Sequence, residues 1–273
     1  MATLSIGVIT YLGPEPGDSY RAIRDLGLTT CQLCNWNPLE VTRAQAELHR
    51  QAAAEAGITI SLFWCGYTGP VVWNYIDGPA TIGLVPPETR TTRVEELQRG
   101  AEIAGWLGVG DMATHVGFLP LDPKDPNYLG AVDALKEIAG YAGERKVYFN
   151  FETGQETPMV LLRTIQDIGL PNLGINLDPA NLLMYGNGNP VDALDVFGTY
   201  VRGVHAKDGE YPTDGRHLGH EKAMGEGRVN FPVLVPKLKA LGYSGTLTIE
   251  REISGEQQIA DIKRAKDILT PLL

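Results

Sequence analysis

The chain has 273 residues, of which 43% are hydrophobic and 21% charged, a size that fits one α/β barrel or two smaller domains. No apolar run approaches the roughly 20 residues needed to cross a bilayer, and no basic segment precedes the first apolar stretch as in a signal peptide, so we expect a cytoplasmic protein without membrane partners. The net charge of −10, with scattered basic residues, argues against nucleic-acid binding.

Short β-rich segments alternate with segments of helical periodicity along the whole chain. Strands are predicted at residues 4–10, 29–33, 58–63, 111–115, 147–152, 173–178, 203–207 and 247–250. Helices are predicted at residues 19–26, 41–56, 89–107, 131–143, 158–168, 190–200, 231–241 and 256–269. Such alternation indicates a parallel sheet with helical crossovers. Eight units in this length predict a closed (β/α)8 TIM barrel, a single domain over residues 1–273.

Several predicted helices end in a glycine that is followed by a strand. A glycine there can adopt the left-handed conformation that ends a helix. These glycines are Gly27, Gly57, Gly108, Gly169 and Gly242. Two long loops, at residues 64–88 and 208–230, instead follow predicted strands. They should lie at the catalytic end of the barrel, where long loops often act as lids.

The three cysteines do not indicate a disulfide-stabilised fold, because their number is odd and small. Cys31 and Cys34 form a C-Q-L-C sequence that superficially resembles a metal or redox pair. Side chains three positions apart on a strand point to opposite faces, however. We therefore expect ordinary buried thiols.

Four consecutive predicted strands end in, or carry near their ends, a side chain that can bind a metal: Glu152, Asp178, His205 and Glu250. The carboxyl ends of barrel strands converge on one pocket. Three carboxylates brought together without a cation would repel one another and raise each other's pKa. Three oxygen ligands with one imidazole suit Mn2+, Mg2+ or Co2+, whereas Zn2+ prefers more nitrogen or sulfur. The pattern predicts one divalent-metal site, with a metal-free hydrogen-bonded cluster as the alternative.

Several motifs occur at these strand ends and before a late helix: N-F-E-T at 150–153, N-L-D-P-A-N at 176–181, V-H-A-K-D at 204–208, G-E-G-R-V-N-F at 225–231 and T-I-E-R-E at 248–252. With them the chain resembles the xylose-isomerase-like barrel superfamily of sugar isomerases and epimerases. The resemblance implies that Glu152, Asp178, His205 and Glu250 bind one divalent ion. We expect Mn2+, with Mg2+, Co2+ or Zn2+ as alternatives. Relatives are often dimers or tetramers, so a homo-oligomer is also an expectation.

The reaction that the resemblance implies is proton transfer next to the carbonyl of a keto-sugar or related polyol, through a metal-stabilised enediolate. Glu152 and Glu250 would be the acid/base pair. A metal-dependent lyase or dehydratase, of inosose or 3-keto-glycoside type, remains an alternative, because it begins with the same proton removal. A DNA-cutting relative would need more histidines at the strand ends, and a binding protein without activity would be expected to lose metal ligands.

Further residues are predicted to contact the substrate. His115 ends the strand before the metal-bearing ones, and Lys207 follows His205 with the alternation that points into the barrel mouth. Trp64 follows the third strand and would form an apolar wall for a sugar ring. Arg216, in the second long loop, would contact a substrate hydroxyl, phosphate or carboxylate.

Two positions depart from the ketose 3-epimerases that the chain resembles. Asn181 stands where those enzymes usually have a histidine that touches the substrate, and Pro158 stands where they have a second glutamate. Glu156 lies close enough in sequence to replace that glutamate. We therefore predict Asn181 and Glu156 as further substrate-binding residues. The two departures argue against a ketose 3-epimerase and strengthen the lyase alternative, but they leave the metal site unaffected.

Overall fold

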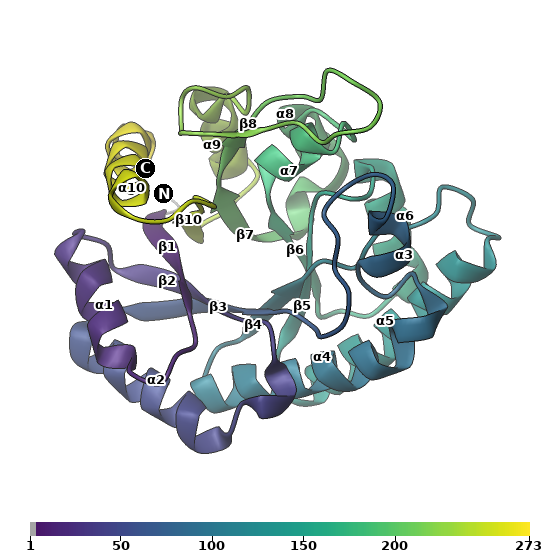
Figure 1. Ribbon diagram of the computed structural model, residues 1–273, viewed down its shortest axis with the longest axis horizontal. Helices are drawn as coiled ribbons and strands as arrows, with labels where there is room; N and C mark the ends of the chain where they lie inside the picture. The colour runs from purple at the N-terminus through teal and green to yellow at the C-terminus, as the bar shows by residue number, and fades with distance from the viewer. Residues whose placement is uncertain (1–3) are drawn as a thin grey trace.

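The computed structural model describes residues 4–273, and eight parallel strands in it close into a barrel (Figure 1). Around the barrel the strands follow the order β1-β10-β7-β6-β5-β4-β3-β2. Their bounds are β1 Ser5–Tyr11, β2 Thr30–Asn35, β3 Thr59–Cys65, β4 Asp111–Thr114, β5 Tyr148–Glu152, β6 Leu173–Leu177, β7 Val201–Ala206 and β10 Thr246–Ile249. The predicted TIM barrel is confirmed.

Helices surround the strands, as expected from the apolar outer face of a parallel barrel. The principal helices are α1 Pro16–Asp25, α2 Arg43–Ala56, α4 Pro87–Leu107, α5 Pro126–Glu144, α6 Pro158–Ile168, α8 Pro190–Phe197, α9 Phe231–Ala240 and α10 Glu256–Leu269. Helix α5 starts five residues earlier than predicted. Its first turn is held by Asp125, whose side chain accepts a hydrogen bond from the Asn127 amide at 2.7 Å, and by a proline at the first position.

Short helical segments that periodicity did not predict occur in the connections. They are α3 Gly78–Thr81, α7 Pro179–Met184 and the 3-10 turns η1 Pro38–Glu40 and η3 Thr270–Leu272. The helix predicted at residues 190–200 divides into α8 and the 3-10 turn η2 Gly198–Tyr200. Helix α7 directly follows β6, and the Asp178 side chain caps it by accepting a hydrogen bond from the Asn181 amide at 2.9 Å. The cap holds the Asp178 carboxylate in one orientation at the end of β6.

The five helix-ending glycines adopt the backbone conformation that the sequence predicted. Gly57 and Gly108, for example, have φ angles of 72° and 73° and follow α2 and α4 directly. Each returns the chain to the amino-terminal end of a strand, as a left-handed residue after a helix allows. These turns lie at the amino-terminal end of the barrel, whereas the candidate site residues lie at the carboxyl ends of the strands.

The core has two parts, one between strands and helices and one inside the barrel. Cys31 belongs to the outer core, whereas Cys34 packs inside with Leu62, Trp64 and Ala113. Both thiols are free and buried, which confirms the prediction of ordinary core cysteines.

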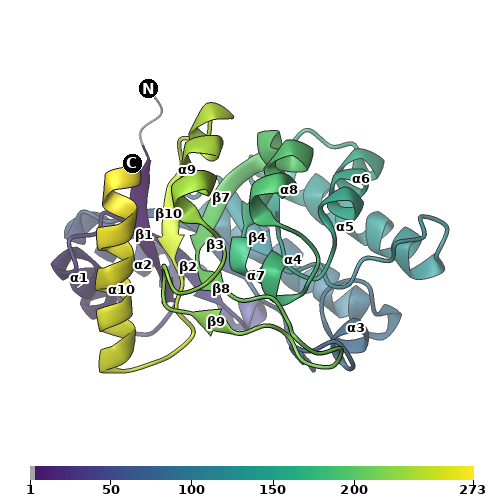
Figure 2. The ribbon, with the colours of Figure 1, turned by 90° about the horizontal axis from the view of Figure 1, so that it is seen from above.

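The two long loops both lie at the carboxyl end of the strands (Figure 2). One contains α3, and the other contains β8 Asp208–Gly209, which pairs antiparallel with β9 Glu221–Lys222. They meet over α7, where the Tyr75 hydroxyl and the Gly219 amide both donate to the Met184 carbonyl, at 3.2 and 2.8 Å. Across residues 4–273, no helix is both long and apolar enough to span a membrane.

Candidate metal centre and active-site pocket

Four neighbouring strands bring together the four metal-binding residues that were predicted from the sequence. Glu152 ends β5, Asp178 follows β6, His205 lies in β7 and Glu250 follows β10. One ligand atom of each lies within 4.8 Å of the ligand atoms of the other three. The parallel register places these residues at one height in the barrel, with Glu152 opposite Asn176 and Thr248 opposite His205.

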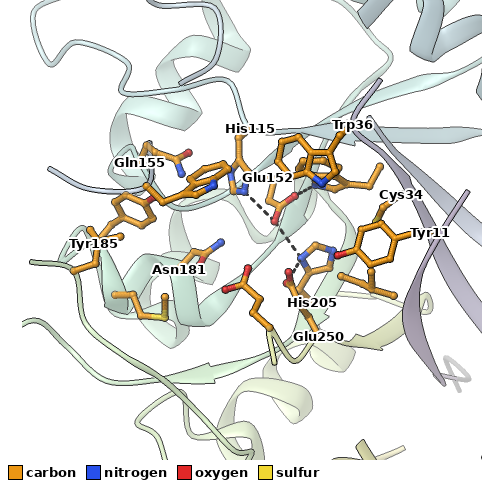
Figure 3. A pocket seen from close by; sticks show the side chains of 16 residues that line it. Tyr11, Cys34, Trp36, His115, Glu152, Gln155, Asn181, Tyr185, His205 and Glu250 are labelled. Carbon is orange, nitrogen blue, oxygen red and sulfur yellow. Dashed lines mark hydrogen bonds and ion pairs between the residues drawn. The ribbon is translucent and has the colours of Figure 1, made fainter. Parts of the chain in front are cut away.

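The imidazole of His205 lies at the centre of this cluster (Figure 3). Its Nδ1 atom is 2.9 Å from Glu250 Oε2, 3.2 Å from Glu152 Oε1 and 3.9 Å from Asp178 Oδ2. The side chains of His205, Glu152 and Asp178 are almost completely buried, and that of Glu250 is mostly buried.

Three buried atoms in the cluster make no hydrogen bond of good geometry, although two of them, His205 Nδ1 and Glu250 Oε2, are only 2.9 Å apart. These atoms are Asp178 Oδ2, His205 Nδ1 and Glu250 Oε2. Buried polar atoms in proteins are nearly always paired, so three unpaired ones at one point need a further partner. A divalent cation bound by carboxylate oxygens and one imidazole nitrogen satisfies all three, so the residues fit the predicted metal site.

A second layer of polar side chains inside the barrel orients the imidazole. His205 Nε2 lies 2.8 Å from Gln32 Oε1, an atom that can only accept, whereas Asn176 Nδ2 lies 3.0 Å away and can only donate. We assign the proton to His205 Nε2 because the acceptor Gln32 Oε1 is nearer than the donor Asn176 Nδ2. The Gln32 side-chain amide is itself held in place, because its own Nε2 donates to Asn176 Oδ1 at 3.0 Å. The lone pair of His205 Nδ1 then faces the carboxylates, as a metal ligand requires.

Opposite charges outweigh burial at His205, Glu152 and Glu250, whereas burial raises the pKa of Asp178. Burial alone would lower the pKa of His205, yet Glu152 and Glu250 raise it well above its usual value, so a metal ion that binds at Nδ1 would displace a proton from that atom. Burial would likewise raise the pKa of Glu152, but His115 and His205 bring it well below the ordinary range. The pKa of Glu250 is also lowered, because Lys207 and His205 outweigh its burial.

Lys207 is a buried cation placed against the carboxylates. Its Nζ atom lies 3.7 Å from both Asp178 Oδ2 and Glu250 Oε1, and 3.0 Å from Glu252 Oε1. Burial opposes its charge, but Glu250 and Asp178 raise its pKa well above the usual value. Lys207 therefore stays positive and offsets part of the negative charge of the ligand set.

A pocket of about 260 Å3 opens over the cluster. Its residues come from every part of the barrel mouth: Ile9, Tyr11, Cys34, Trp36, Trp64, Trp73, His115, Glu152, Gln155, Asn181, Met184, Tyr185, His205, Leu218, Glu250 and Glu252. Trp64 Nε1 donates to Glu152 Oε2, and His115 Nε2 lies 3.3 Å from Glu152 Oε1. Two neighbours thus fix the orientation of the Glu152 carboxylate.

The predicted substrate contacts divide into two groups. Trp64, His115 and Asn181 line the pocket, whereas Lys207, Glu156 and Arg216 do not. Arg216 is exposed in the loop after β8, where its amide donates to Asp214 at 2.7 Å. Glu156 is buried with both carboxylate oxygens unpaired, and burial raises its pKa to about 8.

Several lining residues were not predicted from the sequence. Trp36 follows β2 directly, and Tyr11 is the last residue of β1, so the rule that located the metal ligands also points to them. Gln155 and Tyr185 line the side of the pocket opposite Tyr11 (Figure 3). Gln32 could have been noticed as a polar residue between the apolar residues Cys31 and Leu33 of a predicted strand.

A family model described as xylose isomerase-like TIM barrel matches residues 20–271. The chain belongs to this family. A curated relative, an uncharacterized protein of Methanocaldococcus jannaschii, is 36% identical over 197 residues. The match covers 67% of this chain and 63% of that relative, so the chain spans somewhat less than two thirds of the relative's length.

Solved structures with the same fold also match the whole barrel. A xylose isomerase domain protein from Planctomyces limnophilus superposes with a TM-score of 0.92 at 35% identity, over 99% of this chain and 97% of that one. The 3-keto-D-glucoside 4-epimerase of E. coli superposes with a TM-score of 0.74 at 16% identity, over 98% and 100% of the two chains. The second likeness is one of fold alone. The assignment to the xylose isomerase-like barrels therefore rests on the family match and on the 35% identical structure.

Proposed function

We propose that this xylose isomerase-like protein is a divalent-metal-dependent isomerase or epimerase of a keto-sugar or related polyol. The observation that carries the proposal is the group of four ligand atoms within 4.8 Å, three of them buried without a hydrogen-bond partner. The pocket over this group is lined by both aromatic and polar side chains, as small-molecule sites usually are. Glu152, Asp178, His205 and Glu250 would hold the ion.

Glu152 and Glu250 have the properties of an acid/base pair. They come from β5 and β10, which β6 and β7 separate in the barrel, so their carboxylates approach the pocket from different directions. Both have a lowered pKa and are ionised at neutral pH, so either can accept a proton. A bound divalent ion would polarise the substrate carbonyl and stabilise negative charge developing next to it.

Neighbouring side chains hold these groups for the reaction. Trp64 and His115 orient Glu152, and Lys207 lies against Glu250. Positioned groups avoid the cost of reorganisation during proton transfer. The aromatic lining of Trp64 and Tyr185 also removes water from the region where the carbon acid would ionise.

Proton exchange with solvent tests this proposal directly. The protein with Mn2+ is incubated in D2O with a panel of ketoses and keto-inositols, and the products are followed by 1H NMR. Deuterium at the carbon next to the carbonyl, together with an epimerised or isomerised product, is the expected result. Exchange together with a dehydrated product would move the assignment to the lyase alternative.

Two variants sharpen the exchange experiment. Glu250→Gln keeps an oxygen ligand but cannot accept the proton, so turnover should fall strongly. His217→Ala is the control, because His217 is exposed and pairs only with Asp214 in the loop. Metal-loaded protein that exchanges no proton with any member of the panel would contradict the proposal.

A further inference from the structure

The pocket has a buried inner end and a half-exposed outer end. Glu152, His205 and Trp64 are buried at the inner end. Trp36, Trp73 and Tyr11 line the same pocket but remain 40%, 41% and 61% exposed. Large aromatic side chains grouped at a pocket mouth mark a binding surface, whereas singly exposed ones are common on any protein.

The outer aromatic rings continue directly from the inner ones. The Trp36 ring lies 4.7 Å from that of Trp64 and 6.3 Å from that of Trp73. Trp73 in turn lies 5.1 Å from the ring of His115. The rings therefore form one wall that leads from Glu152 toward solvent.

The backbone beneath Trp36 is shaped to receive its ring. A Cβ atom on Gly66 would lie 2.5 Å from Trp36 Cε3 and 2.9 Å from Cδ2, too close for any side chain. The Gly66 amide also donates to the Asn35 carbonyl at 2.8 Å, which ties the end of β3 to that of β2. Trp36 is thus held in one place while its outer face stays open.

The inner end is already used by the reaction that we propose. Trp64 donates to Glu152 and lines the pocket beside it, so in the proposed reaction the ring that carries the carbonyl lies against Trp64 and between the two glutamates. The pocket of about 260 Å3 is clearly larger than the roughly 150 Å3 cavity that holds a benzene ring. Space and aromatic surface therefore remain beyond a single ring.

The charges around the pocket disfavour an anionic group. Within the described part of the chain, the lining includes Glu152, Glu250 and Glu252 but neither lysine nor arginine. Lys207, the cation near the cluster, is engaged with three carboxylates. Phosphates and carboxylates are normally recognised by arginine, lysine or a helix amino terminus, so neither would find a partner at the outer end.

We propose that Tyr11, Trp36 and Trp73 form an outer subsite that stacks on a second, uncharged ring linked to the keto-sugar. The substrate class is then an uncharged keto-glycoside and not a free or phosphorylated monosaccharide. The inner end of this assignment rests on the proposed function, whereas the outer subsite is a property of the aromatic wall.

Calorimetric titration of the Mn2+-loaded protein with non-reacting ligands tests the subsite. Glucose, cellobiose, phenyl β-glucoside and glucose 6-phosphate are compared. We expect the two-ring ligands to bind about tenfold more tightly than glucose, which is the scale of one or two aromatic contacts. Glucose 6-phosphate should bind no better than glucose. The ratio between cellobiose and phenyl β-glucoside tells whether the outer ring is a sugar or an aryl group.

Three variants locate the effect on the wall. Trp36→Ala should remove the preference for two-ring ligands and leave the glucose affinity unchanged. Trp36→Phe should retain most of that preference. Gly66→Ala should act like Trp36→Ala, because the added Cβ displaces the indole. Ile76→Ala is the control, since Ile76 is exposed on the same loop as Trp73 but outside the pocket.

Three results would overturn the subsite. The first is equal affinity of the wild type for one-ring and two-ring ligands, and the second is an equal loss of affinity for both kinds of ligand in Trp36→Ala. The third is tighter binding of glucose 6-phosphate than of glucose. The titrations need no turnover, so the two proposals fail separately. A preference that depends on Trp36 without any proton exchange supports the subsite and removes the proposed reaction. Proton exchange without such a preference supports the proposed reaction and removes the subsite.

Discussion

The two halves of the barrel mouth supply different kinds of side chain. Strands β5, β6, β7 and β10 lead to the carboxylates and the imidazole, nearly all buried. Strands β1 and β2 and the loop after β3 supply Tyr11, Trp36 and Trp73, all substantially exposed. Groups that must hold an ion are attached to rigid strand ends, whereas groups that contact a variable part of a substrate are exposed to solvent and lie partly on loops.

Two residues connect these halves. Trp64 from β3 and His115, which follows β4, both contact the Glu152 carboxylate and both touch the aromatic wall. A substrate ring on the wall is therefore in contact with the side chains that orient the proposed base. The comparison predicts that changes in the polar half abolish chemistry or metal binding, whereas changes in the aromatic half alter ligand preference.

The largest effect is expected for Glu250→Gln. The amide keeps an oxygen ligand but cannot accept a proton, so kcat should fall on the order of 100- to 10,000-fold, the usual range for loss of an acid/base group. Steady-state kinetics with the substrate found by NMR measures this. A variant that kept more than a tenth of the wild-type kcat would show that Glu250 is not part of the acid/base pair.

The next largest effect is expected for His205→Ala. It removes the central ligand, so the Mn2+ affinity should fall by more than about 100-fold. Loss of a residue that only hydrogen-bonds a ligand usually lowers metal affinity by about 10- to 100-fold. Calorimetric titration with Mn2+ measures the affinity, and His217→Ala should match the wild type. Equal affinities of His205→Ala and wild type would place any ion elsewhere.

Gln32→Leu should have a smaller effect of the same kind. It removes the acceptor of the His205 Nε2 proton without touching the ligand set, so the Mn2+ affinity should fall about 10- to 100-fold. The same titration applies. An unchanged affinity would contradict the assignment of Gln32 as the residue that orients His205.

The smallest effect is expected for Glu156→Gln and concerns stability. The pKa of Glu156 is about 8 in the folded protein and about 4.5 when exposed, so unfolding releases its proton between these values. This group therefore destabilises the fold increasingly as pH rises through that window. The variant should have a Tm a few °C above wild type at pH 9 and no gain at pH 4, by calorimetry in EDTA. A gain that did not change with pH would contradict a neutral buried Glu156.

The sequence was sufficient to predict the barrel, because alternating periodicity and helix-ending glycines repeat along the whole chain. It also indicated which strand ends carry Glu152, Asp178, His205 and Glu250. Helix α7 was missed because six residues are too few for a periodic signal, although Asp178 and Pro179 form a recognisable helix start.

The remaining site depended on long-range packing that no local pattern reveals. The position of Trp36 requires Gly66 directly after the neighbouring strand β3, and the orientation of His205 requires Gln32 from across the barrel. Arg216 was predicted near the substrate because its loop follows a strand, yet its side chain lies outside the pocket. The loop was predicted as 23 residues without regular structure, so its path could not be predicted from the sequence. Loop paths of this length are set by tertiary contacts such as that of Gly219 with Met184.

Elemental analysis tests the central claim most directly. Protein purified without added metal is compared with the double variant Glu152→Gln, His205→Ala, and both are then exposed to Mn2+ and desalted. We predict about one equivalent of a divalent metal in the wild type and almost none in the variant. Absence of metal from the wild type, with no thermal stabilisation on adding divalent ions, would contradict the metal centre.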